Sequence, residues 1–177
     1  MKAIFSLIVL ILSMLMTTGF FQDKNRRELK EWKKLEKQIQ IQSIVDAREF
    51  VFVARTALPT GMRSVNLQTN QNYIKFQPDL INSYMPFFGN AYSSVVYGTD
   101  TGLHFAGKPE IFTVEKKEKS YQVTIVVRGE NDNFKLFLSV GSEGSASLSI
   151  SSNYRSTISY QGEIIAPVKT EDIIPLP

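Results

Sequence analysis

The chain of 177 residues contains no cysteine and a single histidine, His104. Without cysteine no disulfide can stabilise the fold, so the burial of apolar side chains must hold it together. Conventional zinc and copper sites use several nitrogen and sulfur ligands, which this sequence does not supply. We therefore expect no metal and no cofactor. The lack of cysteine also argues against a lipid anchor of the kind attached to that residue.

An excess of one charge is nearly absent as well. The formal net charge is +3. The segment from residue 22 to residue 48 contains eight basic and five acidic residues, so the remainder of the chain is close to neutral. A nucleic-acid binder usually shows a basic stripe on its folded body, and we expect no nucleic-acid partner. The basic segment is interpreted as a solvated helix face. The alternative is a cationic arm that touches anionic lipid headgroups or an acidic partner.

The first nineteen residues have the layout of a cleavable secretory signal. Met1 and Lys2 give a positive start, an apolar run follows over residues 3–16, and Thr17-Thr-Gly19 ends the segment with small residues. The apolar run is shorter than the roughly 20 residues that a membrane-spanning helix needs. We expect cleavage after Gly19 and export to the periplasm or outside the cell, with no transmembrane span left after cleavage.

The segment from Asp23 to about Arg48 is predicted to be helical. Leu29, Trp32, Leu35 and Ile39 recur at helical spacing, and no glycine or proline interrupts the segment. Asp23 is a candidate N-cap. Favourable and repulsive charge pairs along the helix roughly cancel, so we expect the helix to gain its stability by packing its apolar stripe.

From Glu49 onward the apolar period changes from helical to two. Alternation of this kind predicts short antiparallel strands with one solvated face. Residues 50–55 are predicted to form a strand buried on both faces, and residues 62–67 and 72–76 two further short strands. The clearest alternation follows at residues 121–128, 134–140, 146–150 and 158–160. The runs at 62–67 and 72–76 are expected to be joined across the polar turn Gln68-Thr-Asn-Gln71.

The predicted fold class is α+β, mainly β: an N-terminal amphipathic helix followed by a curled antiparallel sheet. A barrel- or sandwich-like meander is favoured because it limits exposed strand edges. The expected organisation is a signal peptide at 1–19, the N-terminal helix at 20–48, the antiparallel β domain at 49–162, and a proline-containing tail or edge strand at 163–177.

A series of motifs gives a family resemblance. The segment dense in aromatics and glycines is Asp79-Leu-Ile-Asn-Ser-Tyr-Met-Pro-Phe-Phe-Gly89, continued to Gly107. With Phe50-Val-Phe-Val-Ala-Arg-Thr-Ala-Leu-Pro59, Arg63-Ser-Val-Asn66 and Asn153-Tyr-Arg-Ser-Thr-Ile-Ser-Tyr-Gln-Gly162, it resembles the bacterial family called domain of unknown function 4251. The resemblance covers roughly residues 44–162. It implies exported or envelope proteins, often lipoproteins, with no established activity and no catalytic residues to transfer. Unlike those lipoproteins, this chain lacks the anchoring cysteine.

Three short patterns suggest chemistry, and each has a simpler explanation. His104 stands in a strand-like Leu-His-Phe context without a nucleophile elbow, so we expect a surface or hydrogen-bonded residue. Asp100-Thr-Gly102 matches the signature of aspartic proteases, but those enzymes need two such carboxylates and no second copy exists. We interpret residues 98–102 as a turn. The acidic loop Glu130-Asn-Asp-Asn133 lacks the ligand pattern of a calcium loop and is interpreted as a hairpin turn.

The aromatic residues of the central region are the best candidates for a binding site. Phe76, Phe87 and Phe105 are expected in the core, because aromatic side chains fill small sheet proteins well. The tyrosines are left open between core and ligand wall, since a tyrosine offers a flat apolar face with a polar tip suited to sugars or lipids. The ligand-binding candidates are Tyr84, Tyr92, Tyr97, Asp100 and His104.

Three functions follow from these patterns. The leading hypothesis is an exported, non-enzymatic protein of the bacterial envelope that binds an apolar or amphipathic ligand or a protein partner, with a lipid, a glycan or an envelope protein as the expected partner. The second is a structural or assembly module that docks through its cationic helix. The third is a hydrolase that uses carboxylates such as Asp100 with Glu110, which requires two carboxyl groups at a set separation.

Overall fold

The computed structural model of the protein describes residues 26–67, 72–92, 102–129 and 132–167. The chain divides into two units, residues 1–37 and residues 38–177. Residues 26–46 are helical, as the apolar spacing predicts, and residues 38–46 of this helix belong to the second unit. The candidate N-cap Asp23 and the signal segment lie outside the described residues. Within the described part of the chain, every helix is too short or too polar to span a bilayer.

The helix ends with a left-handed residue that is not glycine. Arg48 has a φ of 56°, its amide donates to the Val45 carbonyl at 3.0 Å, and the Glu49 amide donates to the Ile44 carbonyl at 3.1 Å. This pair of bonds satisfies the last free carbonyls of the helix and turns the chain into the first strand. The Arg48 guanidinium lies 5.3 Å from the centre of the Phe112 ring, a cation–π contact that helps to offset the backbone cost.

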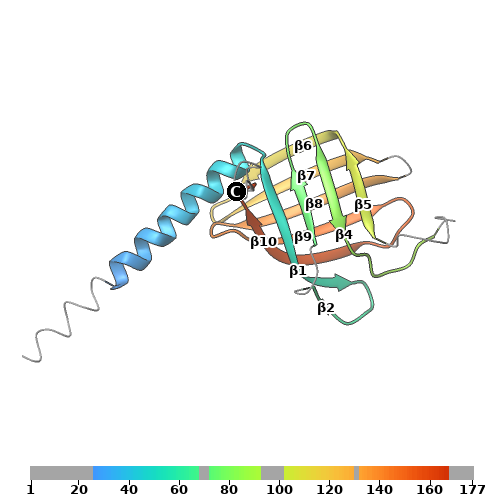
Figure 1. Ribbon diagram of the computed structural model, residues 1–177, viewed down its shortest axis with the longest axis horizontal. Helices are drawn as coiled ribbons and strands as arrows, with labels where there is room; N and C mark the ends of the chain where they lie inside the picture. The colour runs from blue at the N-terminus through green and yellow to red at the C-terminus, as the bar shows by residue number, and fades with distance from the viewer. Residues whose placement is uncertain (1–25, 68–71, 93–101, 130–131, 168–177) are drawn as a thin grey trace, which may run out of the picture. The chain divides into compact units, whose positions relative to one another are not determined.

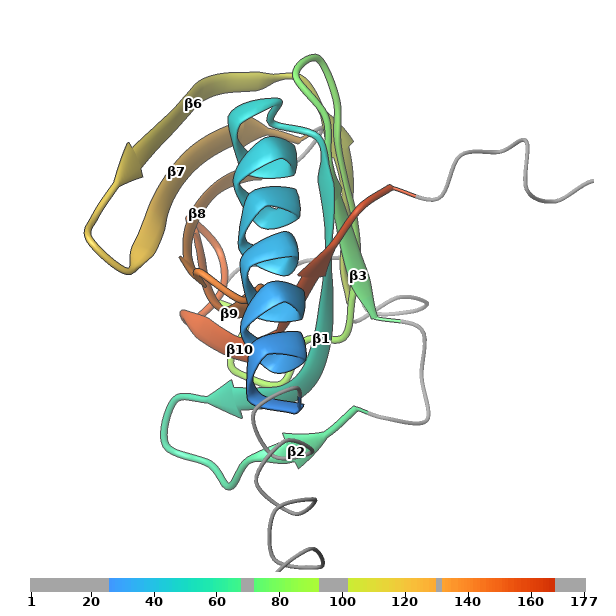
Figure 2. The same ribbon diagram turned by 90° about the vertical axis from the view of Figure 1, so that its left-hand side faces the viewer.

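Ten antiparallel strands form one sheet in the second unit, and the sheet is nearly closed and barrel-shaped. Figure 2 shows β6, β7 and β8 curving around one side, with β1 and β3 on the other. The spatial order is β5-β4-β3-β1-β10-β9-β8-β7-β6, with β2 paired to β1, so β5 and β6 are the two terminal strands. The strands are β1 Phe50–Pro59, β2 Val65–Asn66, β3 Tyr73–Phe76, β4 Ile81–Met85, β5 Leu103–Gly107, β6 Pro109–Lys116, β7 Ser120–Arg128, β8 Asn133–Gly141, β9 Ser145–Ser152 and β10 Ile158–Ile165.

Strand β1 organises one half of this sheet (Figure 1). It pairs with β10 along one edge and with β3 and then β2 along the other. The two short strands expected at 62–67 and 72–76 are present as β2 and β3, although β2 is only two residues long, and both pair with β1. The ten residues of β1 are long enough to hold both partners end to end. Residues 68–71 of the expected turn lie outside the described residues.

Strand β10 is central rather than peripheral. It pairs with β1 on one side and β9 on the other, and Ile164 is buried. Residues 163–165 therefore extend a central strand, which differs from the tail or edge strand expected for 163–177. Apolar Ile164 fills the interior, and Glu163 forms an ion pair with Arg55 of β1 at 2.8 Å. Residues 168–177 lie outside the described residues.

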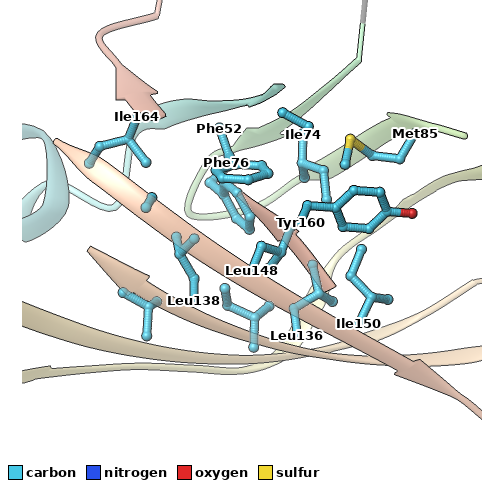
Figure 3. Close-up of a cluster of buried hydrophobic side chains, with 14 of the residues drawn as sticks. Phe52, Ile74, Phe76, Met85, Leu136, Leu138, Leu148, Ile150, Tyr160 and Ile164 are labelled. Carbon is cyan, nitrogen blue, oxygen red and sulfur yellow. The ribbon is translucent and has the colours of Figure 1, made fainter. Parts of the chain in front are cut away.

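The barrel interior is filled by large side chains from both halves of the sheet (Figure 3). Phe52, Ile74 and Phe76 meet Leu136, Leu138 and Leu148 across the interior, and each is at most 1% exposed. The alternating strands β7, β8 and β9 supply one wall, as their period of two predicts. Phe76 and Phe105 are buried, which confirms their predicted place in the core, and Phe87 is partly buried against it.

The helix contributes to this core through residues that the regular stripe does not include. Ile41 and Val45 are buried, whereas Ile39, the last member of the predicted stripe, is 62% exposed. In the first unit, taken by itself, Leu29, Trp32 and Leu35 are also exposed. The expectation that the apolar stripe packs is therefore wrong for Ile39. Packing instead uses the less regular apolar residues Ile41 and Val45, which belong to the core cluster of the second unit.

Tyr160 gives the interior a titratable group. Its hydroxyl donates to the Pro86 carbonyl at 2.6 Å, and burial raises its pKa far above the ordinary value of 10.0, partly opposed by the positive charge of Arg155. An acid whose pKa is raised by folding contributes stability that is complete below about pH 10 and is lost as the pH rises further. We expect the unfolding free energy of the natural protein to fall above that pH.

Tyr160→Phe is the matched variant, because it removes the ionisable group and keeps the ring. We expect the unfolding free energy of this variant to be about 1–2 kcal/mol lower at neutral pH, because the hydrogen bond to Pro86 is lost. Above about pH 10, its unfolding free energy should fall less steeply with pH than that of the natural protein. Urea unfolding at a series of pH values measures both effects. Parallel pH curves for the two proteins would contradict the assignment.

Candidate functional site

The sequence-predicted residues Tyr84 and His104 meet on the outer face of the sheet. They are register partners on β4 and β5, and their rings stack at 4.2 Å between centroids with 13° between planes. Tyr73 on β3 is the register partner of Tyr84 on the other side, at 6.1 Å and 25°. Tyr84 remains 51% exposed. Cross-strand aromatic pairs of this kind stabilise a sheet face and present flat apolar surface to solvent.

A pocket of about 510 Å³ opens beside this stack. Three stretches of chain that are distant in sequence form it: the paired strands β4 and β5, the β7–β8 connection with the start of β8, and the β9–β10 connection. Its lining consists of Asn82, Ser83, Tyr84, His104, Phe105, Ala106, Gly129, Asp132, Phe134, Tyr154 and Arg155.

Three of the lining side chains, Phe105, Phe134 and Ser83, are buried. Phe105 and Phe134 stack at 4.1 Å with 11° between planes, and both are buried. Ser83 is buried as well, and its hydroxyl donates to the Leu103 carbonyl at 2.7 Å, so it ties β4 to β5 beneath the pocket. The stacked phenyl rings therefore belong both to the pocket lining and to the barrel core.

Two charged side chains line the pocket and are held in place by backbone hydrogen bonds. Asp132 Oδ1 accepts from the amides of Asn133 at 2.8 Å and Asn153 at 3.1 Å, which joins the β7–β8 and β9–β10 connections. Arg155 Nη1 donates to the Gly102 carbonyl at 2.6 Å, and its guanidinium lies 5.3 Å from the centre of the Phe87 ring. Both groups are thus positioned before any ligand arrives.

Of the remaining sequence candidates, Tyr92 is the one among the described residues, and it lies outside this site. Tyr92 is 70% exposed and does not line the pocket, although its amide donates to the Tyr154 carbonyl at 2.8 Å. Tyr97 and Asp100 lie outside the described residues, so the carboxylate pair of Asp100 with Glu110 stays a prediction. Glu110 itself forms an ion pair with Arg128 at 3.1 Å. Among the described residues, no three histidine or carboxylate side chains gather in a way that could hold a metal ion.

Comparison with known proteins identifies the family. Residues 33–164 match the family described as Domain of unknown function (DUF4251). The chain belongs to this family. The match confirms the resemblance that the motifs indicate and extends it into the helix.

The fold is also similar to the crystal structure of a DUF4251 family protein from Bacteroides eggerthii DSM 20697. The two share 14% sequence identity with a TM-score of 0.57, over 73% of this chain and 87% of that chain. At this identity the likeness shows the fold alone. A comparison with curated proteins finds no match.

Sequence reasoning missed Asn82, Asp132, Tyr154 and Arg155 as site residues. Tyr154 and Arg155 stand in the motif Asn153–Gly162 that marks the DUF4251 family, so an aromatic residue beside arginine in a loop was an available signal. Asp132 was assigned to a hairpin turn, where it does lie, but its second contact to Asn153 requires the three-dimensional fold.

Proposed function

We propose that the protein is an exported, non-enzymatic component of the bacterial cell envelope that binds an amphipathic molecule in the pocket beside Tyr84 and His104. The secretory layout of residues 1–19 supports export. The observation that most supports binding is an open pocket that combines exposed ring side chains with pre-positioned polar groups on a rigid sheet, the usual composition of small-molecule sites.

The filled interior of the barrel favours a ligand site in this pocket over a ligand site in the lumen. In many barrels the lumen holds the ligand, but here Phe52, Tyr160 and Leu136 occupy it, each fully buried. A ligand inside would have to displace the core. The pocket beside Tyr84 and His104 needs no such rearrangement.

Native mass spectrometry of the protein purified from its own envelope tests this function. We expect a co-bound mass on the natural protein and its loss from the double variant Tyr84→Ala/Tyr154→Ala, because the two rings supply the exposed apolar surface of the pocket. Tyr92→Ala is the control, since this exposed tyrosine lies outside the pocket. A bare natural protein, or equal occupancy of all three proteins, would contradict the proposal.

A second function, docking through the cationic helix, has its own support. At about 100° per residue, the segment 26–37 places only basic side chains on one arc of about 120°, and the apolar stripe occupies the opposite side. In the first unit, taken by itself, the stripe residue Trp32 is 69% exposed. A cationic face of this kind attracts anionic surfaces. The basic arc consists of Arg26, Arg27, Lys30, Lys33, Lys34 and Lys37.

Deleting residues 22–37 tests this second function, because the deletion stops at the boundary of the second unit. We expect circular dichroism to keep the β signal while co-sedimentation with vesicles containing about one-third anionic lipid is lost. A sextuple Lys/Arg→Gln variant of the basic arc, which retains the helix, should lose sedimentation equally. Unchanged sedimentation of both variants would refute docking through the helix.

A further inference from the structure

We propose that the molecule bound in this pocket is a short neutral saccharide. This inference rests on the proposed function and narrows its amphipathic ligand to one chemical class. Saccharides combine an apolar face of C–H groups with a rim of hydroxyls, and sites for such molecules need flat rings together with planar polar groups.

The rings are present in a suitable arrangement. Tyr84 is 51% exposed, Tyr154 is 42% exposed, and His104, also exposed, stacks on Tyr84. Tyr84 and His104 come from the sheet and Tyr154 from the β9–β10 connection, so a ligand in the pocket meets ring surface from two separate segments. Tyrosine suits this task because it adds large contact area with a hydroxyl at its tip.

The polar groups that a saccharide needs are also present, and several of them can form further hydrogen bonds. Among the described residues, the Asn82 amide, the Asp132 Oδ2 atom and the hydroxyls of Tyr84 and Tyr154 have no hydrogen-bond partner. An amide offers both donors and acceptors, and a carboxylate accepts from neighbouring hydroxyls. Because Asp132 Oδ1 is already fixed by two backbone amides, the carboxylate loses little further freedom when Oδ2 accepts a bond from a ligand hydroxyl.

The same geometry argues against the other ligands of an envelope protein. An acyl chain needs a continuous apolar channel, and the stacked Phe105 and Phe134 of this pocket are themselves packed into the core. The described lining holds one carboxylate and one guanidinium, Asp132 and Arg155, so its charges balance and do not favour an ion. A volume of about 510 Å³ lies within the usual range of small-molecule pockets.

Amide-resolved NMR titration of the mature protein tests the inference. The probes are maltotriose, cellotriose, mannotriose and the trimer of N-acetylglucosamine, each to about 10 mM, the range that suits weak binding. We expect saturable shifts at Tyr84, His104 and Tyr154 with at least one trisaccharide. Tyr84→Ala and Asn82→Ala should weaken that binding by about tenfold or more, whereas Tyr92→Ala and Phe137→Ala, which alter exposed aromatics outside the pocket, should not change it.

Absence of shifts at these residues with all four trisaccharides would overturn the inference. A zwitterionic detergent with a ten-carbon chain serves as the second probe. If the detergent shifts the pocket and the saccharides do not, the saccharide inference fails and binding of an amphipathic molecule stands. If neither probe shifts the pocket and the envelope-purified protein is bare, both fail.

Discussion

Replacing Gly162 by alanine is expected to destabilise the protein by about 3 kcal/mol or more, and the variant is expected to accumulate poorly. Gly162 lies on β10 opposite Ala54, beside the point where the register of β1 shifts. A Cβ at this position would overlap the Val53 carbonyl oxygen and approach the Ala54 backbone, both parts of a central strand that cannot yield. The measurement is the midpoint of urea unfolding followed by circular dichroism.

Gly61→Ala is the matched control for this substitution. Gly61 has a φ of 77°, but a Cβ there would meet no atom within 4 Å. The expected cost is therefore the left-handed backbone alone, about 1–2 kcal/mol. If the Gly162→Ala variant were as stable as the Gly61→Ala variant, the backbones of β1 and β10 could not be as close at Gly162 as the structure places them.

Val45→Asp is the second substitution with a large expected effect, a loss of at least about 3 kcal/mol at neutral pH. Val45 is fully buried among the core residues, so an aspartate would be an unpaired carboxylate in an apolar site or would have to take up a proton. The expected consequence is a protein whose β signal melts at a clearly lower temperature.

Ser43→Asp on the exposed side of the same helix is the comparison. It adds the same charge near the same helix end, where a carboxylate costs only about 0.3–1 kcal/mol. Equal thermal midpoints for the two variants would show that residues 38–46 are not part of the barrel core. A difference of about 2 kcal/mol or more supports the packing of Val45.

Much of the fold could be predicted from the sequence, because apolar residues at every second position indicate a strand with one buried face. In β7, β8 and β9 the apolar side chains alternate with polar ones, and Val123, Ile125 and Leu136 are buried as that pattern predicts. Short turns between these runs leave only antiparallel neighbours. The nearly closed barrel follows from the number of strands that curl in succession.

The pairing of distant strands could not be predicted in the same way. Periodicity identifies a strand but not its partner, so the placement of β2 and β3 along β1, and of β10 between β1 and β9, required the structure. The helix shows a related failure. Its most regular apolar stripe includes the exposed Ile39, whereas Ile41 and Val45 are buried because of where the helix meets the sheet.

The candidate site was predicted in part for the same reason. Tyr84 and His104 were candidates because they stand in a region dense in aromatics, and the structure brings them together as register partners. Asp132 and Arg155 join them only through the curvature of the sheet, which places strands β4 and β5 and two distant connections around one pocket. The residue types alone do not indicate that these four side chains lie around one pocket.

The barrel interior is a packed core, and the proposed binding takes place in the pocket lined by Tyr84, His104 and Tyr154. The most direct measurement is an NMR comparison of the protein with and without the molecule that co-purifies from its envelope. We expect shifts at Tyr84, His104 and Tyr154, while the methyl groups of Leu136 and Leu148 stay unchanged. Shifts of those interior methyl groups with an unperturbed pocket would contradict this proposal.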